Sequence, residues 1–377
     1  MSSSKPLAGM KVLEIGHSVA APYAGMILGE LGADVVKLEN PGVGDYARGW
    51  GPPFSGDTAT AFHVFNRAKR GIVADLADAA TCARVRRLIV EEMDVVLHNL
   101  KPGALDKLGL GAAGLLAEKP SLIFCNIGAF GAQGPLNRLP GYDPLMQAFG
   151  GLMSMLGEDG RPPVRVPVSV MDLGTGMWTV IGILAAHAER GRTGLGGVVD
   201  TSLFETSCAW MGLPIGNYLA SGNLPVRAGS GVAEIVPYQA FACADGHLMI
   251  AAGNDNLFRK LCGVIGQPEL ADDPRFAKNA GRVANRAAII DILSAALVAE
   301  TRAAWQARLE AVGVPCGPVQ TLDQVVGHPQ TAALGIVQTS GDGLRTVGLP
   351  LSFDGQRPAY STGAPGLGEH NGEVLGK

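Results

Sequence analysis

The sequence has few of the patterns that build metal centres or disulfide scaffolds. Its six cysteines, at positions 82, 125, 208, 243, 262 and 316, form no Cys-x-x-Cys pair, and its seven histidines are dispersed. A structural zinc site needs closely spaced thiol and imidazole ligands, and a disulfide scaffold needs a denser set of cysteines. We therefore expect no metal site and no disulfide framework.

An excess of charge of one sign and long apolar runs are also lacking. The formal net charge is -4 and the pI is about 6.0, which gives no general attraction for nucleic acid or anionic lipid. The first ten residues contain no apolar signal-peptide region, and no run approaches the roughly 20 apolar residues of a membrane span. These absences predict a cytoplasmic protein without nucleic-acid or membrane partners.

The first part of the chain alternates short β-like runs with helical patterns. Residues 11–15 and 34–39 are strand-like and flank a helical pattern at 22–31, and the alternation continues to a strand at 122–127. This order predicts an α/β fold with a doubly wound, Rossmann-like parallel sheet, whose ligand loops lie at the carboxyl ends of the strands. The first turn, residues 15–22, lacks Gly-x-Gly-x-x-Gly, which argues against a nicotinamide dehydrogenase.

A second pattern begins after a stretch rich in Gly, Pro and Asn at 213–232. Two strand-like runs flank Asp245-Gly246, a strong turn signal, and helical patterns follow at 256–265, 283–300 and 302–311. This order predicts a smaller α+β domain. We divide the chain into a large domain at 1–200, a linker at 201–224, a small domain at 225–315, and a return linker with a C-terminal segment at 316–377 that packs on the large domain.

Asp172 is the carboxylate that most needs an explanation. It lies among Val170, Met171 and Leu173, and a buried Asp is costly unless it is paired, hydrogen-bonded or used. Gly174 and Gly176 predict a flexible bend where a second molecule approaches closely, before a helix begins at about residue 177. Helix capping also explains an Asp at this position, so both explanations remain open from the residues alone.

Other polar positions have similarly balanced explanations. His17 follows the first strand and fits a ligand contact or a hydrogen-bonded structural histidine. Tyr142 and Asp143 fit an active-site pair or a turn with an Asx bond before a proline. Several cations lie on loops of the predicted sheet edge and fit either a phosphate site or solvated surface positions: Arg48, Arg67, Lys69, Arg70, Lys101 and Lys107.

These segments together resemble the family III CoA-transferases, which include formyl-CoA, carnitine and dicarboxylate CoA-transferases. The resemblance covers nearly the whole chain and rests on the order and spacing of residues 6–14, 31–39, 141–143, 172–176, 193–196 and 314–319. It implies an enzyme that transfers CoA, with acyl-CoA and a small carboxylic acid as substrates and no tightly bound cofactor. It also implies an interlocked homodimer.

The resemblance assigns roles to individual residues. It implies that Asp172 is the nucleophile, with Tyr142 and Asp143 in the active site and Gly229 and Gly231 in a glycine-rich loop that covers the site. This loop has fewer glycines than that of formyl-CoA transferase. CoA contacts are implied at His17, Ser18, Ala20, Asn40, Ala74, Ala77, Asn99, Leu100 and Lys107.

The predicted reaction moves CoA between acids through an aspartyl-CoA thioester at Asp172. An ordinary aspartate is ionised at neutral pH and needs no general base. Similarity to dicarboxylate-using members at residues 235–241 and 250–255 favours succinyl-CoA as donor, with Arg165 or Arg227 as candidates for a distal carboxylate. The alternatives are an acyl-CoA racemase, which carries His in place of Tyr142 because proton exchange needs a base of near-neutral pKa, and a non-catalytic CoA-binding protein.

Overall fold

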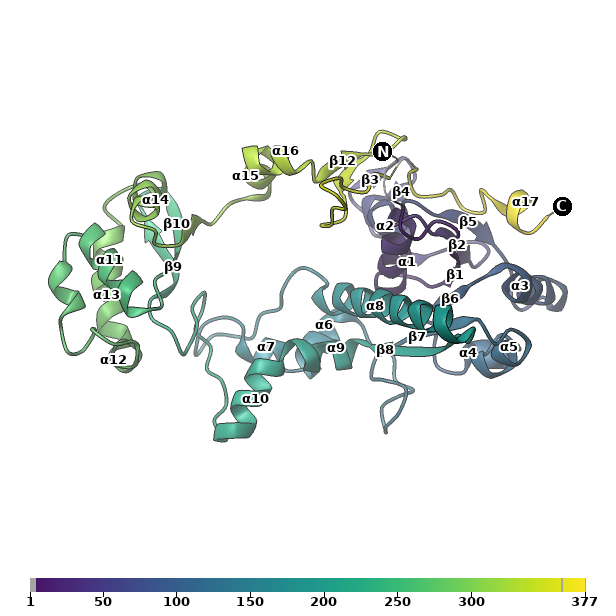
Figure 1. Ribbon diagram of the computed structural model, residues 1–377, viewed down its shortest axis with the longest axis horizontal. Coiled ribbons are helices and arrows are strands. Elements are labelled where there is room, and N and C mark those ends of the chain that lie inside the picture. The colour runs from purple at the N-terminus through teal and green to yellow at the C-terminus, as the bar shows by residue number, and fades with distance from the viewer. Residues whose placement is uncertain (1–4, 361, 377) are drawn as a thin grey trace. The chain divides into compact units, whose positions relative to one another are not determined.

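The computed structural model of the chain describes residues 5–360 and 362–376 (Figure 1). The chain divides into two compact units. Unit 1 comprises Met1–Gly151, Val166–Leu213 and Pro329–Lys377, and unit 2 comprises Leu152–Arg165 and Pro214–His328. The chain therefore passes between the two units four times, and each unit is described by itself below.

Unit 1 is built on a six-stranded sheet in which every neighbouring pair is parallel, as Figure 1 shows. Its strand order is β5-β2-β1-β6-β7-β8. The strands are β1 (Lys11–Ile15), β2 (Asp34–Glu39), β5 (Arg70–Val73), β6 (Val95–His98), β7 (Ile123–Gly128) and β8 (Gly197–Ser202). The predicted α/β fold with a parallel sheet is confirmed.

The sheet order has one reversal, between β1 and β6. From β1 the chain first builds outward through β2 to β5, and then returns to the other side of β1 for β6, β7 and β8. The loops that follow β1 and β6 therefore leave in opposite directions from neighbouring strands. A crevice at the carboxyl ends of such a pair is the usual ligand site of an open α/β sheet.

Helices cover both faces of this sheet. Leu13 and Ile15 face α3 (Ala79–Glu92) and α5 (Ala112–Glu118) in a continuous apolar core. Because side chains alternate along a strand, Glu14 faces the opposite side, under α1 (Ala20–Glu30). Gly25 of α1 makes room for it, since a Cβ there would lie 2.0 Å from a carboxylate oxygen of Glu14.

The helix α8 (Val170–Thr193) corrects one sequence-based expectation. Residues 172–176, predicted as a bend before the helix, lie inside its first two turns. A Cβ on Gly174 would lie 2.4 Å from the ring of Trp210 on α9 (Leu203–Trp210), and one on Gly176 would lie 2.9 Å from the carbonyl of Ala20 on α1. These glycines let neighbouring helices approach, so close helix packing explains them.

The same helix also corrects the expectation about apolar runs. Among the described residues, α8 is the one helix long and apolar enough to cross a membrane by length and composition. Its most apolar window is 39% buried, and it packs against α1 and α9. Core helices of folded domains meet the same criteria, so this match is weak evidence for a membrane span.

The C-terminal segment closes the outer edge of the sheet at β5. The His370 N–H donates to the Gly71 carbonyl at 2.9 Å, and the Val73 N–H donates to the Asn371 side chain at 2.8 Å. The Asn371 amide returns a bond to the Val73 carbonyl at 3.2 Å. The end of the chain thus occupies the hydrogen-bonding positions that a further strand would use.

Shorter elements connect these parts of unit 1. The segment 201–224, predicted as a linker, contains α9, which lies in unit 1, and α10 (Gly212–Ser221), most of which belongs to unit 2. The remaining elements are η1 (Tyr46–Gly49), β3 (Phe54–Ser55), β4 (Thr58–Ala59), α2 (Thr60–Asn66), α4 (Ala104–Lys107), α6 (Asp143–Phe149), α16 (Pro329–Leu334), β12 (Val337–Thr339), β13 (Arg345–Val347) and α17 (Asn371–Val374).

Unit 2 is a three-stranded antiparallel sheet packed on helices. The strand order is β11-β10-β9, and β9 and β10 form a hairpin around Asp245-Gly246. The elements are α7 (Leu152–Met155), β9 (Tyr238–Cys243), β10 (Gly246–Ala251), α11 (Asp255–Val264), η2 (Pro268–Ala271), α12 (Asn279–Ala284), α13 (Arg286–Leu297), α14 (Arg302–Ala311), β11 (Cys316–Pro318) and α15 (Leu322–Gly327). Its core is apolar except for the fully buried Arg282.

Candidate active site

A cavity of about 340 Å³ lies at the carboxyl ends of the strands of unit 1. Its walls come from the loops after β1, β6 and β7, from the segment 46–50 and from the loop 138–142, and Asp172 of α8 also lines it. The loops after β1 and β6 meet where the sheet order reverses. The cavity therefore occupies the place where the topology predicts a ligand.

Asp172 faces this cavity without a partner. Its side chain makes no hydrogen bond or ion pair within the part of the chain that the structure describes, although the residue is half-buried. A carboxylate in such a place has lost much of its water without gaining a cation. This is the environment of a group that is available to a substrate.

The cap of α8 comes instead from Asp143 on α6. One Asp143 carboxylate oxygen accepts the backbone N–H of Met171 at 2.6 Å and that of Asp172 at 3.3 Å. The N-cap residue itself, Ser169, makes no side-chain capping bond. Because a side chain 29 positions earlier satisfies these N–H groups, the Asp172 carboxylate is not needed as a cap.

Burial and the nearby Asp143 charge raise the pKa of Asp172 to about 7. An ordinary aspartate is fully ionised at neutral pH, whereas a substantial part of the Asp172 carboxyl groups is protonated there. The ionised form is correspondingly a stronger base and a stronger nucleophile than an exposed aspartate.

The structure brings about half of the sequence-predicted site residues together. Those that line the cavity are Asp172, Tyr142, His17, Ser18, Ala20, Asn99 and Leu100. Those outside its lining are Asp143, which is buried behind it, and Asn40, Ala74, Ala77 and Lys107. Gly229 and Gly231 belong to unit 2, where Gly229 has a φ of +60°.

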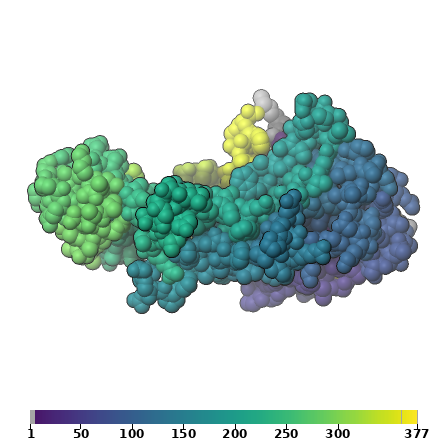
Figure 2. Space-filling view, turned by 90° about the horizontal axis from the view of Figure 1, so that it is seen from below, coloured from purple at the N-terminus to yellow at the C-terminus, as the bar shows by residue number. Residues whose placement is uncertain are grey.

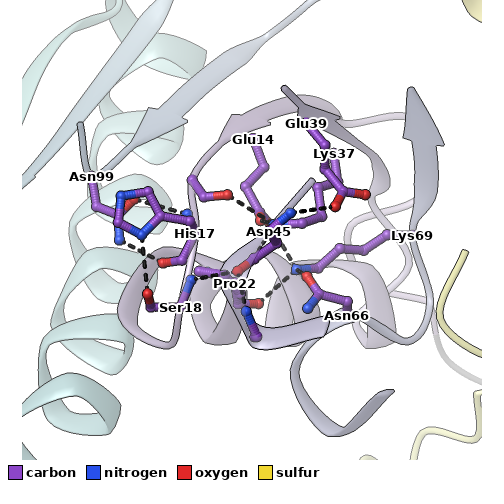
Figure 3. A network of polar contacts seen from close by, with 12 residues as sticks. Glu14, His17, Ser18, Pro22, Lys37, Glu39, Asp45, Asn66, Lys69 and Asn99 are labelled. Carbon is purple, nitrogen blue, oxygen red and sulfur yellow. Dashed lines mark hydrogen bonds and ion pairs between the residues drawn. The ribbon is translucent and has the colours of Figure 1, made fainter. Parts of the chain in front are cut away.

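Asn99 joins the two loops at the reversal of the sheet (Figure 3). Its side-chain oxygen accepts the His17 N–H at 3.0 Å, and its side-chain amide donates to the His17 carbonyl at 2.8 Å. The His17 ring Nδ1 lies 3.0 Å from the Ser18 hydroxyl, and burial lowers the pKa of this imidazole. The Asn99 side chain thus bonds both backbone groups of His17, as a neighbouring strand would, and fixes one wall of the cavity.

Four of the cations proposed for a phosphate site are already paired inside unit 1. Arg48 pairs with Glu39, Arg67 with Glu30, Lys69 with Glu14 and Arg70 with Asp34. Arg227, considered for a distal carboxylate, donates to the backbone carbonyls of Ser154 and Arg161 within unit 2. Sequence position alone did not reveal these partners, because most of them lie far away along the chain.

Two cations on the cavity wall remain, and Arg138 was not singled out from the sequence. Arg138 and Lys101 line the cavity and form no ion pair with a described residue. Tyr46 and Trp50 add aromatic surface to the same wall and were also missed. Their signal in the sequence is weak, since an Arg or Trp in a loop belongs to no repeating hydrophobic pattern. Only the order of the strands could have indicated that these loops lie at the carboxyl edge of the sheet.

A second cavity of about 220 Å³ lies next along the same sheet edge and shares Leu100, Pro102, Ile127 and Gly128 with the first. Its polar lining includes His98, Asn126 and Asp200, which are joined by hydrogen bonds of 2.7 and 2.8 Å. Burial lowers the pKa of His98. No lysine or arginine lines this second cavity, so it is not suited to phosphate.

Comparisons with known proteins show the family of the chain. A Brucella suis structure described as a CAIB/BAIF family protein superposes with a TM-score of 0.88 at 40% identity, covering 98% of each chain. The succinate–glutarate CoA-transferase of Agrobacterium fabrum is 38% identical over 98% of this chain and 95% of its own. The acetyl-CoA:oxalate CoA-transferase of Acetobacter aceti is 37% identical over 97% of this chain and 93% of its own. Residues 7–371 match the family described as CoA-transferase family III. The resemblance read from the sequence is confirmed, and the chain belongs to CoA-transferase family III.

Proposed function

We propose that this CoA-transferase moves CoA from a short acyl-CoA, with succinyl-CoA favoured, to a small carboxylic or dicarboxylic acid through a covalent aspartyl-CoA thioester at Asp172. The observation that carries this proposal is the unpaired carboxylate of Asp172 in the cavity at the reversal of the sheet. CoA thioesters enter as substrates, and no tightly bound cofactor takes part.

The reaction requires four substitutions at acyl carbons. The Asp172 carboxylate attacks the acyl-CoA carbonyl, and CoA thiolate leaves as a mixed anhydride forms. The thiolate attacks the Asp172 carbonyl and releases the first acid as its carboxylate, which leaves the aspartyl-CoA thioester. The incoming carboxylate then displaces thiolate to form a second mixed anhydride, and thiolate attacks the new acyl group to free Asp172. No net proton is consumed, and Asp172 is regenerated.

Residues around Asp172 suit the charges that arise in these steps. The Tyr142 hydroxyl lines the same cavity and would donate to an oxyanion at an attacked carbonyl. The anhydride and the thioester would have to be shielded from water while they exist. Lys101 and Arg138 would meet phosphate groups of CoA or a carboxylate of the acid, because they are the cavity-lining cations without an internal partner.

Relatives that use dicarboxylates support the choice of substrates. Agrobacterium and mammalian proteins named for succinate or succinyl-CoA and glutarate share 35 to 38% identity with this chain. A Chloroflexus aurantiacus protein named succinyl-CoA–D-citramalate CoA-transferase shares 32% identity. We therefore place succinyl-CoA with glutarate or a similar dicarboxylate first among the pairs to be tested.

We also propose that the enzyme is a cytoplasmic homodimer. Helices α8 and α9, which lie in the teal region of Figure 2, expose the apolar residues Met177, Trp178, Ile181 and Trp210, each between 43% and 52% exposed. Such a group of large apolar side chains is typical of a surface that another chain covers. The Gly229–Gly231 loop of unit 2 is proposed to close over the active site, with the positive φ of Gly229 as a hinge.

The covalent intermediate can be tested directly. The enzyme is mixed with succinyl-CoA without acceptor, quenched with hydroxylamine or borohydride, and digested for mass spectrometry. We expect a modified peptide that contains Asp172, and we expect Asp172→Asn and Asp172→Ala to lose both the adduct and transfer to glutarate. Asp291→Asn, which changes an exposed carboxylate on α13, is the matched control and should keep full activity.

Three results would contradict the proposal. Transfer by the Asn variant at the wild-type rate, with deamidation excluded by mass spectrometry, removes the nucleophile. Exchange of the α-proton of a branched acyl-CoA with deuterium, without any acceptor, identifies a racemase. Binding of CoA without an adduct or turnover identifies a non-catalytic binding protein.

A further inference from the structure

Four charged side chains are buried together beneath the loop that follows β1, and we call Glu14, Lys37, Asp45 and Lys69 the ion cluster (Figure 3). Lys37 Nζ lies 2.9 Å from Glu14 and 2.9 Å from Asp45, and Lys69 Nζ lies 2.7 Å from Glu14. All four side chains are almost completely inaccessible to water. Buried charges of this number are costly, and replacing such pairs with apolar residues often stabilises a protein.

The two lysines hold the backbone on both sides of the β1–α1 turn. Lys37 Nζ donates to the Gly16 carbonyl at 2.8 Å, at the end of β1. Lys69 Nζ donates to the Pro22 carbonyl at 2.8 Å, in the first turn of α1. The residues between these two anchors include His17, Ser18 and Ala20, which line the Asp172 cavity. The ion cluster therefore lies directly under one wall of that cavity.

Asp45 connects this turn to a second wall. Its Oδ1 accepts the Ser18 N–H at 2.9 Å and the Ala47 N–H at 2.9 Å, and its Oδ2 pairs with Lys37. Ala47 lies between Tyr46 and Trp50, both of which line the cavity. Burial alone would raise the pKa of Asp45, but the Lys37 charge and the two N–H donors hold it below its ordinary value. One ionised carboxylate thus holds two cavity-lining segments in register.

The backbone at Ser18 needs such support. Its φ of +69° lies in the left-handed region, which is uncommon for residues other than glycine. A conformation of this kind persists only where surrounding bonds hold it. The backbone of Ser18 is held by the hydrogen bond from its N–H to Asp45 of the ion cluster.

We infer that Asp45 is a positioning residue for the CoA-transferase reaction, which sets the β1–α1 turn and the 45–50 segment at the spacing that the acyl-CoA requires, through its bonds to Ser18 and Ala47. The inference rests on the proposed function of the Asp172 cavity. Asp45 itself does not line the cavity. Its effect on substrate is therefore transmitted through the backbone that it holds.

A double-mutant experiment separates positioning from plain stabilisation. Asp45→Ala should raise the KM for succinyl-CoA about tenfold, the effect of losing one charged hydrogen bond, and change kcat by less than about threefold. Asp45→Asn keeps an acceptor for the two N–H groups and should have a smaller effect. Ser18→Gly should largely suppress the effect of Asp45→Ala on KM, because glycine adopts positive φ without support.

Ser18→Ala is the control for the glycine variant. It also loses the hydroxyl that contacts His17, but it keeps the cost of positive φ, so Asp45→Ala should retain its full effect on KM in this background. A second control is Glu30→Gln, which breaks the buried ion pair with Arg67 away from the cavity. This variant should lower the melting temperature and leave the KM unchanged.

Hydrogen exchange tests the same inference without any substrate. In the wild type we expect slow exchange in a peptide that spans residues 16–21, and at least tenfold faster exchange there in Asp45→Ala but not in Glu30→Gln. If the wild type transfers no CoA at all, the proposed function is wrong, but the hydrogen-exchange result for Asp45→Ala still stands. Equal changes in KM for Asp45→Ala and Glu30→Gln, or effects of Ser18→Gly and Asp45→Ala that simply add, would overturn the positioning role.

Discussion

The two units of the molecule treat buried charge in opposite ways. Unit 2 buries one cation, Arg282, whose guanidinium donates to three carbonyls, pairs with Asp255 at 3.1 Å and lies over the Phe258 ring. Unit 1 buries many more charges, and its half-buried Asp172 faces a cavity without a hydrogen bond or ion pair to a described residue. The comparison teaches that paired buried charges hold neighbouring segments of the chain together, whereas a carboxylate without a partner is available to a ligand.

The largest effect on stability is expected where the pairing is complete. Arg282 donates to the carbonyls of Val236, Phe276 and Gly253, so Arg282→Met leaves buried acceptors unsatisfied. We expect a loss of about 3 to 5 kcal/mol in the free energy of unfolding of unit 2, measured in urea. Arg259→Met removes an exposed arginine from the same unit and should cost far less stability. Similar losses in both variants would break the comparison.

Replacing the unpaired Asp172 should raise the stability of the protein, whereas replacing Arg282 should lower it. The pKa of Asp172 is raised in the folded protein, to about 7, so the folded state keeps a proton between about pH 4 and 7 that the unfolded chain has lost. Stability therefore falls as pH rises through this window and stays low above it. Asp172→Asn should be more stable than the wild type by about 1 to 3 kcal/mol at pH 8, allowing for water in the cavity, with the difference vanishing near pH 4. Chemical denaturation at both pH values provides the measurement.

Two glycines of α8 allow the packed and the solvent-facing side of one helix to be compared. Gly174→Ala would press a methyl group into Trp210, and we expect a loss of about 1 to 3 kcal/mol. Gly191 has no atom within 4 Å of its would-be Cβ, and Gly191→Ala should gain about 0.5 to 1 kcal/mol from helix propensity. Thermal unfolding of both variants tests this, and a gain in both would remove the packing explanation for Gly174.

The pH dependence of activity gives the smallest expected effect. With the ionised form of Asp172 as the proposed nucleophile, kcat/KM should fall by roughly fivefold between pH 7 and pH 6, along an acid limb with an apparent pKa of about 7. The charge of Asp143 contributes to the raised pKa, so Asp143→Asn should move this limb to lower pH. Asp106→Asn, which changes an acid lining the neighbouring cavity, should leave the limb in place. An unchanged limb in Asp143→Asn would show that burial alone sets the pKa.

The sequence predicted those parts of the fold that depend on local pattern. The bounds of β1 and β2 agree with the expected strands, because apolar runs between turn residues specify them without help from the rest of the chain. The start of α8 was missed because its cap, Asp143, comes from another helix. In the same way, Lys37 on β2 and Lys69 before β5 gave no sign of being buried, since the carboxylates that pair with them come from two other segments of the chain.

The candidate site was predictable to a similar extent. Family resemblance identified Asp172 and Tyr142, and the structure places both at one cavity with His17 and Asn99. Position along the chain could not show that Arg67, Lys69 and Arg70 are neutralised internally, or that Arg138 reaches the wall. These facts depend on long-range contacts, which a single sequence does not reveal.

The bonds of His370 and Asn371 cover the peptide groups at the edge of the sheet along β5. An outermost strand with free peptide groups is a template for strands of other chains, and here the final residues occupy those groups at Gly71 and Val73. A chain shortened before His370 would expose this template and should aggregate with increasing concentration, while its catalytic carboxylate is untouched. The C-terminal segment would thus prevent edge-to-edge pairing of sheets from different molecules.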